Sequence, residues 1–196
     1  MKILKCILLL LILSSSLQAK YPFEKYFKRY SAKYFNKNFD YYWFIAQSKQ
    51  ESAFNPNAIS YVGAEGLMQI MPNTWNDLTN NIFDVKSPKY NIKYGILYDR
   101  KMWNIYKAPR PFIDRISFML GSYNAGAGNI IKAQKLAEKN SANPNIWHNI
   151  INTLPKITGK HSKETILYVK KIKQYYYEMA KTRFRSFIYA RNYFLY

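Results

Sequence analysis

Apolar side chains recur at every third or fourth position through most of the chain beyond residue 20. This spacing is typical of helices that bury one face. The first stripe is aromatic, and the last, which begins at Ser162, is strongly amphipathic. Capping and turn residues between the stripes locate the helix ends, with Asp40 as an expected N-cap. The pattern predicts helices over residues 23–35, 41–52, 72–78, 91–106, 112–122, 129–139 and from 162 onward.

Glycine and proline mark the breaks between these stripes. Residues 58–72 are apolar and interrupted by glycines, which favours a small hairpin or an irregular segment. Residues 125–128 form a second break, and Pro144 and Pro155 bound what we expect to be a looser region around Trp147. Little of the chain remains for a sheet. The pattern therefore predicts a mainly α fold with a small irregular β segment.

The N-terminal residues follow a different order. Lys2 and Lys5 precede an unbroken apolar run over residues 7–13, and small residues follow up to Ala19. This order is typical of a secretory signal peptide. The run is much shorter than the roughly 20 apolar residues that a membrane-spanning helix needs. We expect export to the periplasm and removal of residues 1–19. An uncleaved membrane anchor is the alternative, because Leu17 is large for a cleavage site.

Basic residues far outnumber acidic ones, with 30 lysines and arginines against 11 aspartates and glutamates, and the formal net charge is +19. Such a charge attracts polyanions, which include nucleic acid, anionic lipid and a cell wall carrying peptide carboxylates. Behind a signal peptide, nucleic acid is the least accessible of these, so we expect no nucleic-acid partner. A monomer is the default expectation.

Metal and cofactor chemistry find no support in the residue pattern. The only histidines are His148 and His161, and the only cysteine, Cys6, would leave with the signal peptide. These residues cannot supply the ligand spacing of a usual metal site. The glycines around residue 126 lack the lysine and hydroxyl ending of a phosphate-binding loop. We expect neither a metal nor a cofactor.

Glu51 is the first candidate for chemistry. It falls near the end of a predicted helix whose neighbours include Trp43, Phe44 and Phe54. Apolar walls disfavour the charged form of a carboxyl and raise its pKa. A raised pKa keeps a glycosidase acid protonated near neutral pH. Taken alone, however, Glu51 is better explained as an ordinary surface glutamate on a helix, where most glutamates lie.

Four short motifs around Glu51 and beyond change this picture. They read QESAFNPNAIS at 50–60, GAEGLMQIMPNT at 63–74, SYNAGAG at 122–128 and ETILYV at 164–169. Their identity and order resemble the soluble lytic transglycosylase (SLT) family, which is related to goose-type lysozyme. The resemblance covers residues 38–180. It implies a mainly helical, lysozyme-like domain with a groove for a sugar polymer.

The resemblance also implies a reaction and a substrate. Family members cleave the β-1,4 bond between N-acetylmuramic acid and N-acetylglucosamine in peptidoglycan glycan strands without adding water. The C6 hydroxyl of the muramic acid attacks its own anomeric carbon and leaves a 1,6-anhydro end. Glu51 would act first as acid and then as base. The substrate's N-acetyl group would stabilise the cationic intermediate.

Further site residues carry over from the same motifs as substrate-binding positions. Several also have a plainer interpretation. Ser60 is otherwise a turn serine, Glu164 a carboxylate in the first turn of a helix after a Ser162 cap, and Tyr168 a packing residue. Tyr123 is expected to hydrogen-bond Glu51 or stack on a sugar. The implied substrate-binding residues are Ser60, Gln69, Met71, Tyr123, Asn124, Glu164 and Tyr168.

These inferences divide the chain into a signal peptide (1–19), a helical extension (20–37), a catalytic domain (38–180) and a tail (181–196). In the tail, four basic residues alternate with aromatic ones. We expect a terminal helix that packs its aromatic side chains on the domain, and contact with an anionic membrane surface or with a polyanionic strand is the alternative.

Two other functions remain open. A hydrolytic lysozyme on the same fold would need a second carboxylate, and Asp84 and Asp99 are candidates, whereas Glu65 is expected to face solvent. A protein that only binds cell wall or membrane would use the charge but would not need Glu51.

Overall fold

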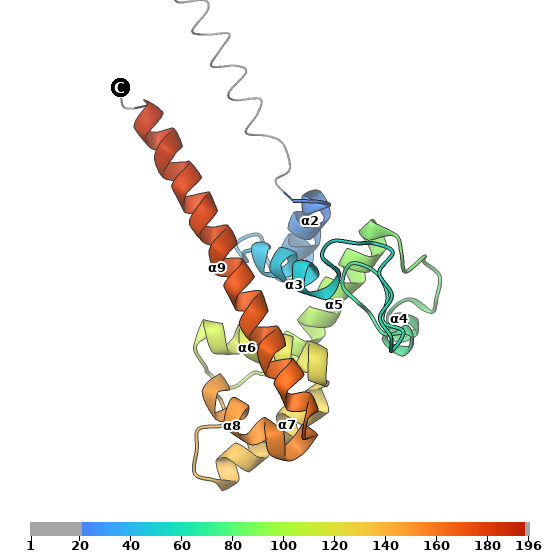
Figure 1. The fold of residues 1–196 in the computed structure, drawn as a ribbon, viewed down its shortest axis with the longest axis vertical. Helices are drawn as coiled ribbons and strands as arrows, with labels where there is room; N and C mark the ends of the chain where they lie inside the picture. Colours follow the sequence, from blue (N-terminus) through green and yellow to red (C-terminus); the bar gives the residue numbers. More distant parts are fainter. Residues whose placement is uncertain (1–20, 195–196) are drawn as a thin grey trace, which may run out of the picture.

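The computed structural model describes residues 21–194, with side chains up to residue 183. Within this range the chain forms eight helices and, in place of a sheet, two isolated β-bridges between residues 59 and 70 (Figure 1). The helices are α2 (Glu24–Tyr34), α3 (Tyr42–Ser52), α4 (Pro72–Thr79), α5 (Pro88–Ile105), α6 (Phe112–Ala125), α7 (Ala127–Lys139), α8 (Trp147–Thr158) and α9 (His161–Phe194).

Helix α6 lies at the centre of the fold. Every residue from 116 to 122 is buried, and α5, α7, α8 and α9 all contact the helix. A helix that is buried on all sides must be apolar or small on all sides. Gly121 illustrates the tight packing, because a Cβ added there would lie 2.3 Å from the Trp147 ring. The packing of α6 therefore fixes the position of residues 123–125, which end this helix.

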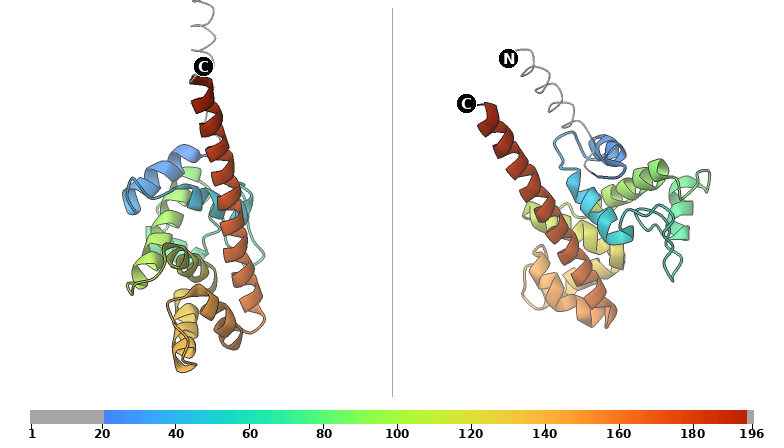
Figure 2. Two further views of the ribbon diagram at one scale, coloured as in Figure 1. Left: turned by 90° about the vertical axis from the view of Figure 1, so that its left-hand side faces the viewer. Right: turned by 45° about the horizontal axis from the view of Figure 1, so that its top comes forward.

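Helix α9 runs along one side of the molecule, from the end where α7 and α8 lie to a point beyond α3 (Figures 1 and 2). It packs on α3, α6 and α8. At its crossing with α3, the rings of Trp43 and Tyr176 stack with centroids 3.7 Å apart. One helix thus joins the two ends of the domain.

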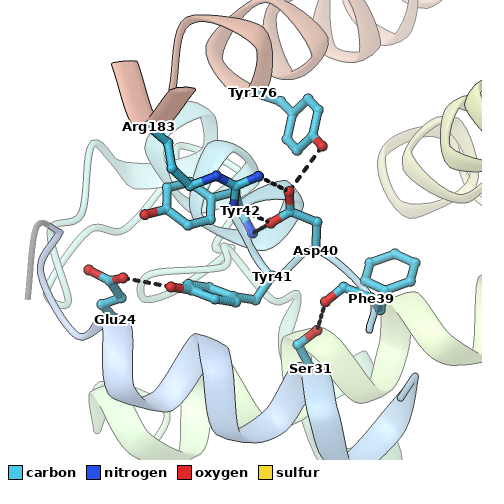
Figure 3. Close-up of polar contacts among 8 residues, drawn as sticks. All are labelled: Glu24, Ser31, Phe39, Asp40, Tyr41, Tyr42, Tyr176 and Arg183. Atoms are coloured by element: carbon cyan, nitrogen blue, oxygen red, sulfur yellow. Dashed lines mark hydrogen bonds and ion pairs between the residues drawn. The ribbon is translucent and has the colours of Figure 1, made fainter. Parts of the chain in front are cut away.

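A polar cluster fixes the start of α3 to α9 (Figure 3). The Asp40 carboxylate accepts hydrogen bonds from Arg183 Nη2 at 2.8 Å, from the Tyr176 hydroxyl at 3.1 Å and from the Tyr42 backbone N–H at 3.2 Å. The Tyr41 hydroxyl donates to Glu24 of α2 at 2.8 Å. An isolated surface ion pair adds little stability, but several bonds on one carboxylate act together.

Most of the predicted elements are confirmed, with shifted ends. Helix α3 begins one residue after the prediction, and Asp40 accepts the Tyr42 N–H as a cap would. Helix α5 begins three residues early, with Pro88 in its first turn. The break predicted at 125–128 narrows to Gly126, whose φ of 81° few other residues adopt. Helix α9 begins at His161, and the Ser162 hydroxyl donates to the Gly159 carbonyl, so Ser162 is not its cap.

The looser region predicted around Trp147 is wrong. Residues 147–158 form helix α8, with Pro155 inside it. Trp147, Ile150 and Leu154 lie on one face of this helix and are almost fully buried. Burial of this face outweighs the backbone hydrogen bond that Pro155 cannot donate.

The predicted boundary between domain and tail at residues 180 and 181 falls inside α9, which continues without a break to Phe194. The tail side chains beyond residue 183 and the predicted signal peptide lie outside the described part of the structure. None of the helices described is both long enough and apolar enough to span a bilayer.

The irregular segment between α3 and α4 depends on one buried asparagine. The Asn91 amide nitrogen donates to the carbonyls of Glu65 (3.2 Å) and Val85 (2.8 Å), and its oxygen accepts the Met68 N–H at 2.7 Å. Asn91 is 0% exposed. A side chain of α5 therefore supplies hydrogen bonds that a sheet would otherwise give to this segment, and it also bonds Val85 in the loop between α4 and α5.

We predict that Asn91→Ala lowers the free energy of unfolding by about 3 kcal/mol, because three buried backbone groups lose their partner. Urea denaturation would measure this loss. Asn38→Ala, at an exposed position, should leave the unfolding midpoint unchanged. Equal midpoints for Asn91→Ala and the parent would show that other contacts hold the segment.

Candidate active site

The last turn of α3 carries Glu51, and the helix ends immediately after it. Ala53 and Phe54 adopt φ values of 51° and 66°, a left-handed conformation that costs energy for residues with a Cβ. The hydroxyls of Ser48 and Ser52 both donate to the Leu67 carbonyl at 3.0 Å. The end of α3 is thereby fixed to the irregular segment that follows it.

Glu51 is partly buried and bonded to the long C-terminal helix. The Tyr168 hydroxyl of α9 donates a hydrogen bond to Glu51 Oε1. Burial raises the pKa of Glu51 to about 8, the Tyr168 hydrogen bond lowers it, and the negative charge of Glu164 raises it. The direction predicted from the sequence is confirmed. Glu51 is therefore mostly protonated at neutral pH and can donate a proton.

Glu51 opens into a pocket of about 220 Å³. Seven of the eight residues predicted for the site line it, and the eighth, Tyr168, is 6% exposed and reaches the pocket through Glu51. The structure thus brings together residues from α3, α6, α9 and the irregular segment. The lining residues are Glu51, Ser60, Tyr61, Val62, Ala64, Gln69, Met71, Tyr123, Asn124 and Glu164.

The irregular segment holds its own pocket residues in place. The Ser60 hydroxyl accepts the Ala64 N–H at 2.9 Å, as in the turn interpretation, while Ser60 also lines the pocket. The Gln69 amide donates to the carbonyls of Ala58 (3.2 Å) and Gly66 (3.1 Å). Gln69 has a positive φ of 45°. Met71 is 43% exposed, so its apolar side chain faces the groove.

Tyr123 and Tyr168 differ in what they bond. The Tyr123 hydroxyl donates to the Met68 carbonyl at 2.7 Å and does not bond Glu51. The hydrogen bond to Glu51 that was one of the expectations for Tyr123 is made by Tyr168 instead. Tyr123 still lines the pocket.

Asn124 links α6 to α9 beside the pocket. Its side-chain oxygen accepts the Thr165 hydroxyl at 2.7 Å, and its nitrogen donates to Glu164 Oε1 at 3.4 Å. Glu164 is exposed and lies in the first turn of α9, as its plainer interpretation requires, and it also lines the pocket. The first-turn position of Glu164 is confirmed, although Ser162 is not the cap, and its substrate-binding role stays a prediction.

Two further pockets adjoin the first and lengthen it into a groove. One, of about 250 Å³, shares Gln69, Met71, Tyr123 and Asn124 with the Glu51 pocket. The other, of about 390 Å³, shares Asn124 and Glu164 and extends to His161. Asn124 lines all three. An elongated groove suits a polymer better than a single small molecule.

The other acids weighed from the sequence do not reach this pocket. Asp84 is exposed in the loop between α4 and α5, outside the pocket. Glu65 is half-buried and lines a separate pocket with Trp75. Asp99 is 0% exposed. Among the described residues, Glu164 is the only other acid that lines the pocket with Glu51. The described residues also hold no group of three or more His, Cys, Asp or Glu placed to bind a metal.

The family model described as "Transglycosylase SLT domain" matches residues 26–146, more than half of the chain. The chain belongs to this family. The match begins within the predicted extension and ends before α9, so the domain limits of 38–180 stay a prediction.

Relatives of the SLT family agree in both sequence and fold. Membrane-bound lytic murein transglycosylase F of Pectobacterium atrosepticum is 36% identical over 115 residues, which are 59% of this chain and 24% of that protein. Its counterpart in Photobacterium profundum is 29% identical over 174 residues, covering 82% of this chain and 32% of that protein. A solved 70-kDa soluble lytic transglycosylase in complex with bulgecin A aligns with a TM-score of 0.63 and 27% identity, covering 82% of this chain and 24% of that one. The chain thus spans about a quarter to a third of these longer proteins, and the predicted lysozyme-like SLT fold is confirmed.

Sequence reasoning missed part of the site. Tyr61 and Val62 line the pocket, and the turn-forming residues Ser60 and Gly63 on either side of them were the signal in the sequence that both are exposed. Gln47 was also missed. It lies one helical turn before Glu51, and its amide donates to Asp99 Oδ1 at 3.3 Å in the core.

We predict that Tyr168→Phe raises the pKa of Glu51, because the hydroxyl stabilises the carboxylate form and lowers that pKa. NMR titration of the Glu51 side-chain carboxyl would measure the change. Tyr177→Phe, at an exposed position of the same helix, is the matched control. A Glu51 pKa that stays the same or falls in Tyr168→Phe would contradict this prediction.

The Asp99 and Gln47 pair suggests a protonated Asp99. Burial raises the pKa of Asp99 well above its ordinary value, and Asp99 Oδ2 and Gln47 Oε1 both lack a partner. A carboxyl whose pKa is raised in the fold costs stability as pH rises from its unfolded pKa to its folded one. Asp99→Asn should therefore resemble the parent at pH 4 and be the more stable of the two at pH 8.

Urea denaturation at both pH values would test this expectation for Asp99. Asp99→Ala is the contrasting variant, because it leaves the buried Gln47 amide without a partner and should lose about 1–3 kcal/mol. A loss of stability in Asp99→Asn that is the same at both pH values would show that Asp99 is not the titrating group.

Proposed function

We propose that this protein is a peptidoglycan lytic transglycosylase. The observation that carries the proposal is a carboxyl that is neutral near pH 7, in the groove of a chain that belongs to the SLT family. An ordinary glycosidase needs a second carboxylate at a defined separation. A reaction in which one carboxyl serves both steps does not. Membership of the SLT family and the names of the curated relatives support the same reaction.

In the proposed reaction, protonated Glu51 donates its proton to the glycosidic oxygen between N-acetylmuramic acid and N-acetylglucosamine as the bond to the anomeric carbon breaks. The substrate's N-acetyl group stabilises the resulting cation. The Glu51 carboxylate then accepts the C6 hydroxyl proton while the C6 oxygen bonds to the anomeric carbon. The proton returns to Glu51, no water is consumed, and the product is 1,6-anhydro-N-acetylmuramic acid.

Tyr168 has a defined part in this cycle. Its hydroxyl donates to Glu51 and so stabilises the carboxylate that exists between the two steps. The remaining lining residues are proposed to bind the glycan strand, with amides and hydroxyls for its polar edges and Met71 for an apolar face. These residues are Ser60, Gln69, Met71, Tyr123, Asn124 and Glu164.

A hydrolytic lysozyme is the second candidate. It is favoured by one observation, which is that Glu164 lines the same pocket as Glu51. A carboxylate in that position would activate a water molecule as general base. The product would then carry a reducing end instead of an anhydro end.

We further propose export to the periplasm and action on the cell wall as a monomer, without nucleic acid. The N-terminal sequence pattern and the net charge of +19 support this location and a polyanionic partner. The basic and aromatic residues of 181–196 support contact with an anionic membrane surface.

Incubation of the purified protein with peptidoglycan sacculi, followed by mass spectrometry of the soluble products, separates these functions. A transglycosylase releases anhydro-muropeptides that are one water lighter than the products of a lysozyme. A protein that only binds releases nothing. Products with reducing ends alone would replace the proposal with the lysozyme.

We predict that Glu51→Gln loses turnover by roughly a thousandfold while keeping its fold, because an amide cannot give and retake the proton. The variant should also gain thermal stability relative to the parent as pH rises from 5 to 9, since the charged form of buried Glu51 is disfavoured in the fold. Release of soluble fragments and melting temperature would be measured for both.

Glu138→Gln, at an exposed position of α7, is the control and should match the parent in both measurements. Full activity in Glu51→Gln would remove Glu51 from its proposed role.

A further inference from the structure

The irregular segment carries a group of exposed apolar side chains at the edge of the Glu51 pocket. Tyr61 is 97% exposed, Val62 is 54% exposed and Met71 is 43% exposed. All three line the same pocket as Glu51. Grouped apolar exposure of this kind usually marks a surface that binds something. We call these three residues the apolar lip.

The lip is held by a closed turn. The Ser60 carbonyl accepts the Gly63 N–H at 3.0 Å, the Ser60 hydroxyl accepts the Ala64 N–H at 2.9 Å, and the Ala64 carbonyl accepts the Ser60 N–H at 2.9 Å. Gly63 has a φ of 85°, which suits glycine. Tyr61 and Val62 occupy the two central positions of this turn. The backbone is therefore ordered before any ligand arrives, which reduces the entropy lost on binding.

The rest of the pocket wall is polar. Asn124 comes from α6 and Glu164 from α9, and both present hydrogen-bonding groups to the same pocket. A pyranose ring has matching chemistry, with apolar C–H faces and polar edges. A ring whose face lies on an aromatic side chain can direct its hydroxyl and acetamido groups to Asn124 and Glu164. A flat apolar ligand would cover the exposed Glu164 carboxylate without offering it a hydrogen bond.

We propose that the apolar lip is a sugar-binding subsite, in which the Tyr61 ring stacks on a pyranose of the glycan strand beside the bond that Glu51 cleaves. This inference rests on the proposed function, because it takes the groove to hold a glycan. Continuity with the Glu51 pocket identifies the occupant, since a strand whose glycosidic oxygen lies at Glu51 must pass its neighbouring sugars along the pocket wall. Tyr61 contributes binding, and Glu51 contributes the chemistry.

The test measures binding without turnover. In the Glu51→Gln protein, the dissociation constant for peptide-free glycan strands, prepared by amidase treatment of peptidoglycan, would be compared with and without Tyr61→Ala. We expect Tyr61→Ala to weaken binding roughly tenfold, which corresponds to about 1.4 kcal/mol. Tyr61→Phe and Tyr61→Trp should keep the affinity of Glu51→Gln, because stacking needs the ring and not the hydroxyl.

Two controls separate binding from folding. Ile82→Ala removes another exposed apolar side chain, 73% exposed and outside the pocket lining, and should leave the dissociation constant unchanged. The melting temperature should be the same in Tyr61→Ala as in its parent, because an exposed side chain contributes little to the core.

The outcomes distinguish this inference from the function on which it rests. Equal affinity with and without Tyr61→Ala overturns the subsite and leaves the transglycosylase proposal intact. A loss in Tyr61→Phe as large as in Tyr61→Ala overturns stacking by the ring. Failure of the Glu51→Gln protein itself to bind the strands overturns both.

Discussion

The hydrogen bond between Tyr168 and Glu51 joins residues that lie 117 positions apart in the sequence. One partner ends α3 and the other lies on the buried face of α9, so the bond forms only if these helices cross in a fixed register. The stack of Trp43 on Tyr176 and the cluster around Asp40 set that register farther along the same pair of helices. The central position of α6 then brings Tyr123 and Asn124 to the same pocket as Glu51. The arrangement of the acid therefore depends on the packing of the whole domain and not on a local motif.

The irregular segment and the end of α3 contain residues in unfavourable backbone conformations, and these residues lie close to the site. Ala53, Phe54 and Gln69 all adopt positive φ values. Such conformations persist only where surrounding contacts over-determine them. Here the contacts are those of Asn91, the two serine hydroxyls on the Leu67 carbonyl and the Gln69 amide on its own segment. The segment gives up regular hydrogen bonding, and in return it places Ser60, Tyr61 and Met71 on one pocket wall.

Helix periodicity and the four motifs were enough to predict the fold class, most of the helices and a set of residues that the structure gathers around one pocket. Their failures have identifiable physical causes. Pro155 was read as a helix breaker, whereas the buried face of Trp147, Ile150 and Leu154 keeps α8 helical. Sequence spacing could not decide whether Tyr123 or Tyr168 reaches Glu51, because that depends on how α6 and α9 cross. Tyr61 was overlooked because an aromatic residue in an apolar segment is usually buried, although the centre of a tight turn is where one stays exposed.

A carboxyl that both gives and takes a proton works best with a pKa near the ambient pH, since either extreme would slow one of the two steps. The environment of Glu51 contains groups that raise its pKa and a group that lowers it. Burial and the charge of Glu164 disfavour the carboxylate, while the Tyr168 hydroxyl favours it, and the pKa lies at about 8. In the proposed reaction, burial alone would make Glu51 a ready proton donor but would disfavour the carboxylate that the second step needs. Hydrogen-bond donors without burial would lower the pKa of Glu51, so that it would already be ionised before the substrate binds. Tyr168 and Glu164 lie four residues apart on α9. A small rotation of that helix would therefore change the effects of both residues on the pKa of Glu51.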